Sequence, residues 1–153
     1  MAINYFDSSA FFKRYVEESG SGKVRELLSI EPAIVSLLSI PEMGSALSRL
    51  SRQGRMSSEN ARMLFGRAVR DLQLHTTVEV SADLLSEAAQ RLLRSTDPGL
   101  RTLDAVHVVS ASRTFRMYET QGIPIGAFVA ADRRLLDAAA RSGLRTINPE
   151  ELE

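Results

Sequence analysis

Residues 2–9 read AINYFDSS, so bulky apolar residues run directly into a carboxylate and two hydroxyls. A helical apolar pattern follows from Ala10, which makes the stretch typical of a buried strand with Asp7 at its carboxyl end. In open α/β sheets, ligands bind beyond that end of the strands. Taken alone, however, Asp7 or Ser8 is more simply interpreted as the cap of the next helix, because both residue types commonly cap. The rest of the chain has to decide between these roles.

Length and composition indicate one globular domain, which we expect to cover residues 1–153. Of these residues, 44% are hydrophobic and 25% are charged, and the chain is long enough to bury a sizeable core. No apolar run approaches the roughly 18 residues that span a membrane, and no secretory signal is visible. The absence of cysteine excludes disulfides, thiolate metal sites and cysteine nucleophiles. We therefore expect a cytoplasmic protein without a membrane partner.

The charge is balanced overall but uneven along the chain. The formal net charge is zero, so no global field attracts nucleic acid. Residues 49–70 nevertheless carry six arginines against one acidic residue, Glu59. These are Arg49, Arg52, Arg55, Arg62, Arg67 and Arg70. The segment is either a solvated helical face or a phosphate-binding surface, and the sequence favours neither.

Short apolar runs alternate with helical patterns along the whole chain. Strands are predicted near residues 2–6, 33–38, 75–80, 124–130 and 144–147. Helices are predicted near residues 9–16, 23–29, 39–53, 57–72, 81–93, 102–119 and 133–142. This alternation predicts an α/β fold in which helices cover both faces of a mostly parallel sheet.

Four acidic residues share one kind of position in this scheme. Asp7 follows the first strand, Glu42 begins the helix after the second, Asp104 begins the long helix, and Asp132 follows the fourth strand. Strand ends and the starts of the following helices share one rim of a parallel sheet. Asp132 can also be a helix cap, and Glu42 can complement a helix dipole. Asp104 is harder to explain in that way, because a carboxylate among apolar neighbours is costly unless paired or metal-bound.

Four carboxylates on one rim would repel each other and raise each other's pKa values. Divalent cations remove this cost, and oxygen-rich sites suit Mg²⁺ or Mn²⁺. Such a site can hydrolyse phosphodiester bonds with an activated water. The sequence has no P-loop and no Gly-x-Gly-x-x-Gly pattern. His107 lies three positions after Asp104, and we expect it to support the site rather than to bind metal.

At these residues the chain resembles the PIN-domain family, specifically the VapC-type toxins of toxin–antitoxin systems. The resemblance rests on four blocks in the family's order, which together extend over nearly the whole chain. They are YFDSSAFFKRYV at 5–16 with Gly20-Ser21, SIPEM at 39–43 with Ala46-Leu47, LRTLDAVH at 100–107, and AADRRL at 130–135.

The resemblance implies a three-layer α/β/α domain with a central, mostly parallel five-stranded sheet. It also implies an endoribonuclease toxin of a type II toxin–antitoxin system, which uses Mg²⁺ or Mn²⁺. The catalytic metal ligands would be Asp7, Glu42, Asp104 and Asp132. The implied partners are an RNA substrate, a cognate antitoxin protein that covers the acidic pocket, and a second copy of the chain in a homodimer.

One position departs from the family pattern. Members often have Ser or Thr two positions before the last Asp, where this chain has Ala130. A hydrogen bond from that hydroxyl toward metal-bound water is therefore in doubt, and Ser8 is our candidate to supply part of it. Among the arginines, we expect Arg101 to approach the substrate, because it is close in sequence to Asp104.

Two other functions remain to be weighed. A PIN-like protein that binds RNA or a protein without cutting would fit the zero net charge and Ala130. A phospho-acceptor receiver domain has a similar sheet, but it requires paired acidic residues after the first strand and a lysine after the fifth. Here the first strand ends in a single Asp, and no lysine occurs after Lys23.

Overall fold

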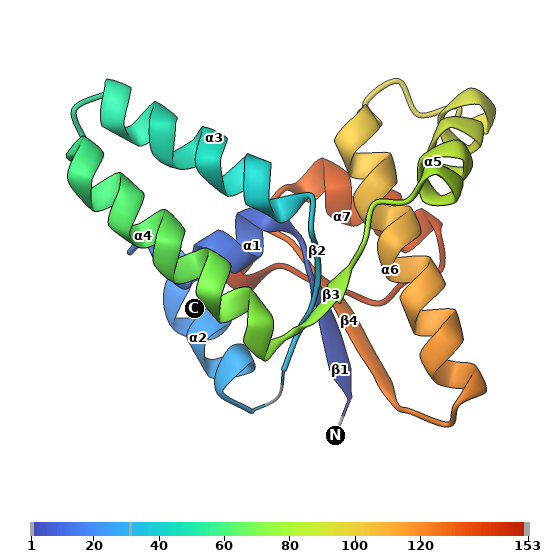
Figure 1. The fold of residues 1–153 in the computed structure, drawn as a ribbon. Helices are drawn as coiled ribbons and strands as arrows, with labels where there is room; N and C mark the ends of the chain where they lie inside the picture. The colour runs from blue at the N-terminus through green and yellow to red at the C-terminus, as the bar shows by residue number, and fades with distance from the viewer. Residues whose placement is uncertain (1, 31, 152–153) are drawn as a thin grey trace.

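A computed structural model describes residues 2–30 and 32–151 of the chain. Its centre is a five-stranded parallel sheet with the strand order β3-β2-β1-β4-β5 (Figure 1). The strands are β1 (Ile3–Phe6), β2 (Ile34–Ser36), β3 (Thr76–Val78), β4 (Ile125–Val129) and β5 (Thr146–Ile147). The first strand is thus the middle strand. The predicted parallel sheet and three-layer α/β/α architecture are confirmed.

Helices cover both faces of the sheet (Figure 1). The α-helices of the described residues are α1 (Ser8–Phe12), α2 (Ser21–Ile30), α3 (Ser39–Arg52), α4 (Ser58–Asp71), α5 (Ala82–Arg94), α6 (Thr102–Thr120) and α7 (Arg133–Arg141). Helices α1 to α4 lie on one side, with α3 and α4 forming a long hairpin, and α5 to α7 lie on the other (Figure 1). Within residues 2–30 and 32–151, no helix has the length and apolarity to span a membrane.

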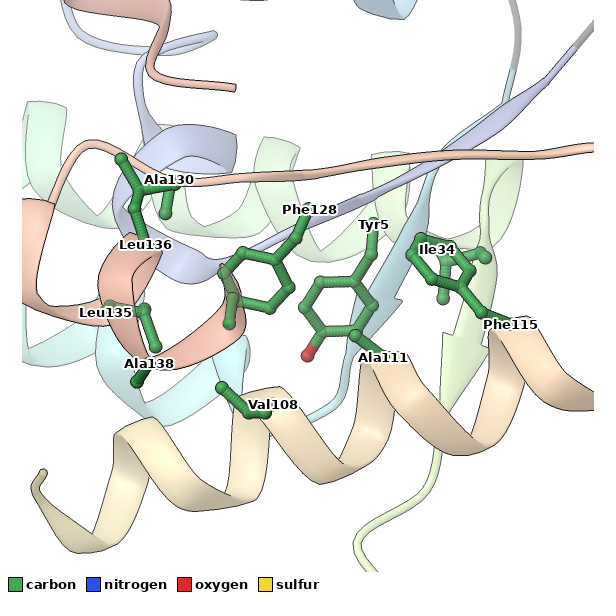
Figure 2. Close-up of a cluster of buried hydrophobic side chains, with 11 residues drawn as sticks. Tyr5, Ile34, Val108, Ala111, Phe115, Phe128, Ala130, Leu135, Leu136 and Ala138 are labelled. Carbon is green, nitrogen blue, oxygen red and sulfur yellow. The ribbon is translucent and has the colours of Figure 1, made fainter. Parts of the chain in front are cut away.

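Strand β1 supplies adjacent side chains to the two faces of the sheet, as the two-residue period of a strand requires. Tyr5 joins the core cluster under α6 and α7, whereas Phe6 joins the cluster under α1 to α4. The ring of Tyr5 stacks on Phe128 of β4, with centroids 5.1 Å apart. Figure 2 shows both rings above α6, with the Tyr5 hydroxyl directed toward that helix. The core therefore brings one polar atom to α6.

Strands β1 and β4 approach each other so closely that no side chain fits at Gly126. Oδ1 of Asn4 accepts a hydrogen bond from the N–H of Ala127 at 2.8 Å. A Cβ atom at Gly126 would lie 2.2 Å from that oxygen and 3.1 Å from the carbonyl oxygen of Ile3. The pairing of the two central strands shifts register between Ile3 and Tyr5. The glycine thus permits the close approach of the two strands.

Helix α1 is shorter than the sequence predicts, because it ends at Phe12 rather than near residue 16. From Lys13 onward the N–H groups bond to carbonyls three residues back, which is the tighter pattern of a turn. The buried amine of Lys13 lies 3.2 Å from Glu18 and 2.7 Å from Glu150. These ion pairs tie the end of α1 to the short 3₁₀ helix η2 (Pro149–Glu151).

Candidate active site

The four carboxylates predicted from the sequence line one pocket. Asp7, Glu42, Asp104 and Asp132 all belong to the lining of a cavity of about 690 Å³. They come from the carboxyl edge of the sheet, where the N–H of Asp7 still bonds to the carbonyl of Val129 on β4. Ser8, Ser9 and His107 line the same pocket. The topology therefore gathers residues from the start, middle and end of the chain.

Two of these carboxylates are also helix caps. Oδ1 of Asp7 accepts a hydrogen bond from the N–H of Ala10 at 2.8 Å and begins α1. Oδ1 of Asp132 accepts from the N–H of Arg134 at 2.9 Å and begins α7. The two interpretations of Asp7 are therefore compatible, because the residue caps a helix and lines the pocket. Capping fixes each carboxylate at a helix N-terminus, where the helix dipole stabilises negative charge.

The other two carboxylates lie in first helical turns. Glu42 is in the first turn of α3, and Asp104 is in the first turn of α6. Oδ2 of Asp104 accepts a hydrogen bond from the backbone N–H of Arg101 at 3.0 Å. All four acidic side chains therefore belong to helix starts at one edge of the sheet.

Asp7 is the most deeply set of the four, with 4% of its surface exposed. Burial raises the pKa of Asp7 above its usual value, while nearby His107 and the bond from Ala10 oppose the rise. The sequence argument expected mutual repulsion among carboxylates to be the cause, but desolvation is the largest contribution. The hydroxyl of Ser9 lies 2.9 Å from both oxygens of Asp7. A cation beside this carboxylate would offset its desolvation.

Glu42 belongs to a chain of polar contacts that reaches the core. Its Oε2 lies 2.8 Å from Nε2 of His107, and Nδ1 of His107 lies 2.8 Å from the hydroxyl of Tyr5. Burial raises the pKa of Tyr5 well above 10, so its hydroxyl keeps its proton. A carboxylate oxygen only accepts, so in the neutral imidazole the proton of His107 lies on Nε2, facing Glu42, and Nδ1 accepts from the Tyr5 hydroxyl. The Ser8 hydroxyl also contacts Glu42, so the structure places Ser8 beside a carboxylate of the pocket.

Arg101 and Arg134 contact the carboxylates in different ways, and the approach of Arg101 to the substrate stays a prediction. Arg101 contacts Asp104 through its backbone, and its exposed side chain is not part of the pocket lining. The guanidinium that reaches the site belongs to Arg134, whose Nη2 lies 3.0 Å from Oδ2 of Asp132. Its Nε lies 3.5 Å from Oδ2 of Asp104. The sequence signal that could have indicated Arg134 is its place in the first turn of the helix that Asp132 caps.

Two further arginines line the pocket on the side of the α3–α4 hairpin. Arg49 lies near the end of α3, and Arg55 lies in the turn that follows. Both are exposed, and among residues 2–30 and 32–151 neither has a carboxylate within 4.0 Å. Part of the arginine-rich segment thus borders the acidic pocket.

The donor set fits a hard divalent cation in its chemistry. Carboxylate oxygens are the ligands that Mg²⁺ and Mn²⁺ prefer, and a guanidinium cation already contacts two of these carboxylates. Within the described part of the chain, no three His, Asp or Glu side chains are close enough together to hold one ion.

Comparisons with known proteins identify relatives of the chain. No profile of a known protein family matches the chain. Ribonuclease VapC45 of Mycobacterium tuberculosis strain CDC 1551 is 33% identical over 161 residues, covering 100% of this chain and 99% of the relative. Ribonuclease VapC46 of strain H37Rv is 33% identical over 150 residues, covering 97% and 99%.

Solved structures share the fold. M. tuberculosis VapC20, described as a toxin that cleaves the sarcin–ricin loop, superposes with a TM-score of 0.63 at 19% identity, covering 95% of this chain and 99% of VapC20. PAE2754 from Pyrobaculum aerophilum gives a TM-score of 0.52 at 23% identity, covering 89% and 78%. From its full-length identity to these relatives and its acidic pocket at the sheet edge, the chain belongs to the VapC family of PIN-domain ribonucleases.

Proposed function

We propose that this chain is the toxin of a type II toxin–antitoxin system, an endoribonuclease that requires Mg²⁺ or Mn²⁺ and hydrolyses RNA phosphodiester bonds with an activated water. Membership of the VapC family supports a ribonuclease. The observation that carries the proposal is the convergence of four carboxylates on one pocket at the sheet edge. The described function of VapC20 as an RNA-cleaving toxin is consistent with it.

In this proposal, Asp7, Glu42, Asp104 and Asp132 are the catalytic residues and hold the cation. When bound, the cation lowers the pKa of the attacking water and stabilises the charge that develops on the phosphate. The chain's own contribution is to fix these oxygens in place. The N–H of Ala10 and the hydroxyl of Ser9 hold Asp7.

Glu42 is oriented by its neighbours rather than by a cap. The imidazole of His107 donates to Glu42 from Nε2, and the Tyr5 hydroxyl fixes that tautomer by donating to Nδ1. Such a relay limits the rotation of the carboxylate, which preserves the geometry that metal-assisted catalysis requires. Ser8 contacts the same carboxylate and is a further candidate to hold it.

We propose that Arg49 and Arg55 hold the RNA backbone beside the carboxylates. Both line the pocket and both are exposed without a carboxylate partner in the described ranges. Arginine forks match phosphate oxygens, and phosphate contacts set the register of a nucleic acid without reading its sequence. They also supply positive charge beside a pocket that would otherwise repel RNA.

The remaining family properties are proposed on the same basis. We expect a single domain over residues 1–153 that acts in the cytoplasm, forms a homodimer and is neutralised by an antitoxin protein. A cation-binding pocket of about 690 Å³ is large enough to admit part of a partner protein. Light scattering on the purified chain measures the mass and so tests the dimer.

The test of function is cleavage of an RNA panel, including a hairpin of the sarcin–ricin type, by the purified chain with Mg²⁺, with Mn²⁺ and with EDTA. We expect cleavage that depends on metal and falls by at least about a hundredfold in Asp104→Asn, because the substitution removes one charge from the cation's ligands. The matched control is Asp83→Asn, an exposed acidic residue in the first turn of α5 outside the pocket.

Three results would contradict the proposal. They are cleavage by Asp104→Asn at the parent rate, cleavage that persists in EDTA, and RNA binding without turnover under every metal condition. The last result would favour a PIN-like protein that binds RNA without cutting it.

A further inference from the structure

Arg134 contacts the pocket's carboxylates without lining the pocket. Nη2 of Arg134 lies 3.0 Å from Oδ2 of Asp132, and its Nε lies 3.5 Å from Oδ2 of Asp104. The two carboxylates line the cavity and the arginine does not. The guanidinium therefore reaches both from outside the cavity wall. One planar group thus spans the first turns of two helices, α6 and α7.

The two carboxylates are held by Arg134 in different ways. At Asp132, Oδ1 caps α7 and Oδ2 accepts a hydrogen bond from Nη2 of Arg134. At Asp104, Oδ2 accepts from the Arg101 N–H, and the buried Nε of Arg134 lies 3.5 Å away without making a hydrogen bond. The other oxygen of Asp104, Oδ1, accepts no hydrogen bond from the residues that the structure describes. Arg134 is thus hydrogen-bonded to Asp132 and ion-paired with Asp104.

Gly99 leaves room for the side chain of Arg134. A Cβ atom at Gly99 would lie 2.9 Å from Cδ of Arg134 and 3.5 Å from its Cγ. The N–H of Gly99 donates to Oδ1 of Asp97 at 2.9 Å, and Asp97 pairs with Arg141 near the end of α7. The loop is therefore fastened to the same helix that carries Arg134. The absence of a side chain at position 99 gives the arginine its route.

We infer that Arg134 is a positioning residue, which holds Asp104 and Asp132 at one separation from outside the pocket so that both can bind a divalent cation. The inference rests on the proposed function, because it takes a cation at this site. Two physical effects of Arg134 predict opposite changes in metal affinity when the arginine is removed. As a nearby positive charge, Arg134 repels the cation, so its removal would tighten metal binding. As a support for two ligands, its removal loosens binding.

The test measures Mn²⁺ affinity of the full-length chain without RNA, by isothermal titration calorimetry. In Arg134→Gln we expect the Mn²⁺ dissociation constant to rise about tenfold. We expect Arg134→Lys to be weakened as well, because one ammonium group cannot span both carboxylates. Gly99→Ala should weaken binding in the same direction, since its Cβ displaces the arginine. The control is Arg133→Gln, whose exposed side chain contacts Glu151 and not the pocket.

Unchanged or tighter Mn²⁺ binding in Arg134→Gln would overturn the inference. So would full parent affinity in Arg134→Lys, because charge alone would then suffice, and so would absence of Mn²⁺ binding by the parent. Failure of the proposed function is seen separately. If the Mn²⁺ affinities of parent and variants follow the expected order but the parent cuts no RNA, the positioning role of Arg134 stands and the proposed ribonuclease function fails. If the parent cuts RNA and Arg134→Gln binds Mn²⁺ as tightly as the parent, the ribonuclease function stands and the positioning role fails.

Discussion

The hydroxyl of Tyr5 lies 2.8 Å from Nδ1 of His107, and this contact joins the central strand to the acidic pocket. Tyr5 is fully buried, and the opposite ring nitrogen of His107 lies 2.8 Å from Glu42. The packing of the core and the orientation of a proposed metal ligand are therefore connected through one imidazole. A substitution at Tyr5 should therefore affect Glu42, and a substitution at Glu42 should affect the packing around Tyr5.

The first prediction concerns this contact. In Tyr5→Phe, the buried Nδ1 of His107 loses its donor, so the free energy of unfolding should fall by about 1–3 kcal/mol. Urea denaturation measures the change. The control is Tyr118→Phe, which removes a half-buried hydroxyl 3.3 Å from Oγ1 of Thr76 and should change stability less. Equal effects of the two substitutions would argue against a special role for the Tyr5–His107 contact.

The second prediction concerns RNA binding by the pocket arginines. Replacing Arg49 and Arg55 together with Gln should raise KM for RNA while leaving kcat near the parent value, because these residues contact phosphates rather than the reacting atoms. The slope of log affinity against log salt should shrink by about 0.7 for each lost phosphate contact. The matched control replaces Arg62 and Arg70, which lie on α4 outside the pocket lining. A salt slope equal to the parent's would contradict the assignment.

The third prediction concerns the close packing of β1 against β4 at Gly126. Gly126→Ala places a Cβ atom against Oδ1 of Asn4, and it should lower the free energy of unfolding by about 2 kcal/mol or more through overpacking. Adding Asn4→Ala removes the clashing oxygen. The double variant should therefore be less destabilised than the sum of the two single variants. Strictly additive effects in denaturation experiments would show that the two residues do not interact.

The fourth prediction concerns pH. Burial lowers the pKa of His75 below its usual 6.5, and the neighbouring Arg14 lowers it further. The unfolded chain therefore takes up the proton first as the pH falls below about 6.5. Stability should be lost between that pH and the lower pKa of the folded state. In the folded chain, Nδ1 of His75 accepts a hydrogen bond from the Ala33 N–H at 3.0 Å.

His75→Asn tests the prediction, because the amide oxygen can accept the same bond and does not titrate. Denaturation midpoints of parent and variant should converge as the pH falls from 7 toward 5. A constant difference between them across that range would assign the pH dependence to other groups.

Much of the fold could be predicted because its signals are local. Apolar runs mark the strands, and Ser57 and Ser81, at the predicted starts of two helices, cap α4 and α5. The four carboxylates could be grouped because parallel strands share one edge. Non-local contacts could not be predicted in this way. Tyr5 and His107 are 102 positions apart, and each taken alone fits an ordinary core residue.

The contacts of Arg134 show the same limit. Closeness in sequence to Asp104 led us to expect Arg101 near the substrate, which stays a prediction, and the backbone of Arg101 contacts Asp104. Which guanidinium reaches the carboxylates depends on the direction in which α7 leaves β4 and on space at Gly99. Neither the direction of α7 nor the space at Gly99 can be inferred from the local sequence pattern of residues 97–104. Similarly, Lys13, just after α1, pairs with Glu150 from a distant part of the chain, a contact that the local pattern does not indicate.

The middle position of β1 has a consequence for the order in which the protein is made. The first strand to be synthesised has β4 as one neighbour, and Asp132 follows β4 directly. At about 5–20 residues per second, a nascent chain carries Asp7 for several seconds before Asp132 exists. The complete acidic pocket therefore cannot assemble before β4 and Asp132 have been synthesised. During that interval the nascent chain has Asp7 at the end of a strand whose β4 neighbour is still missing.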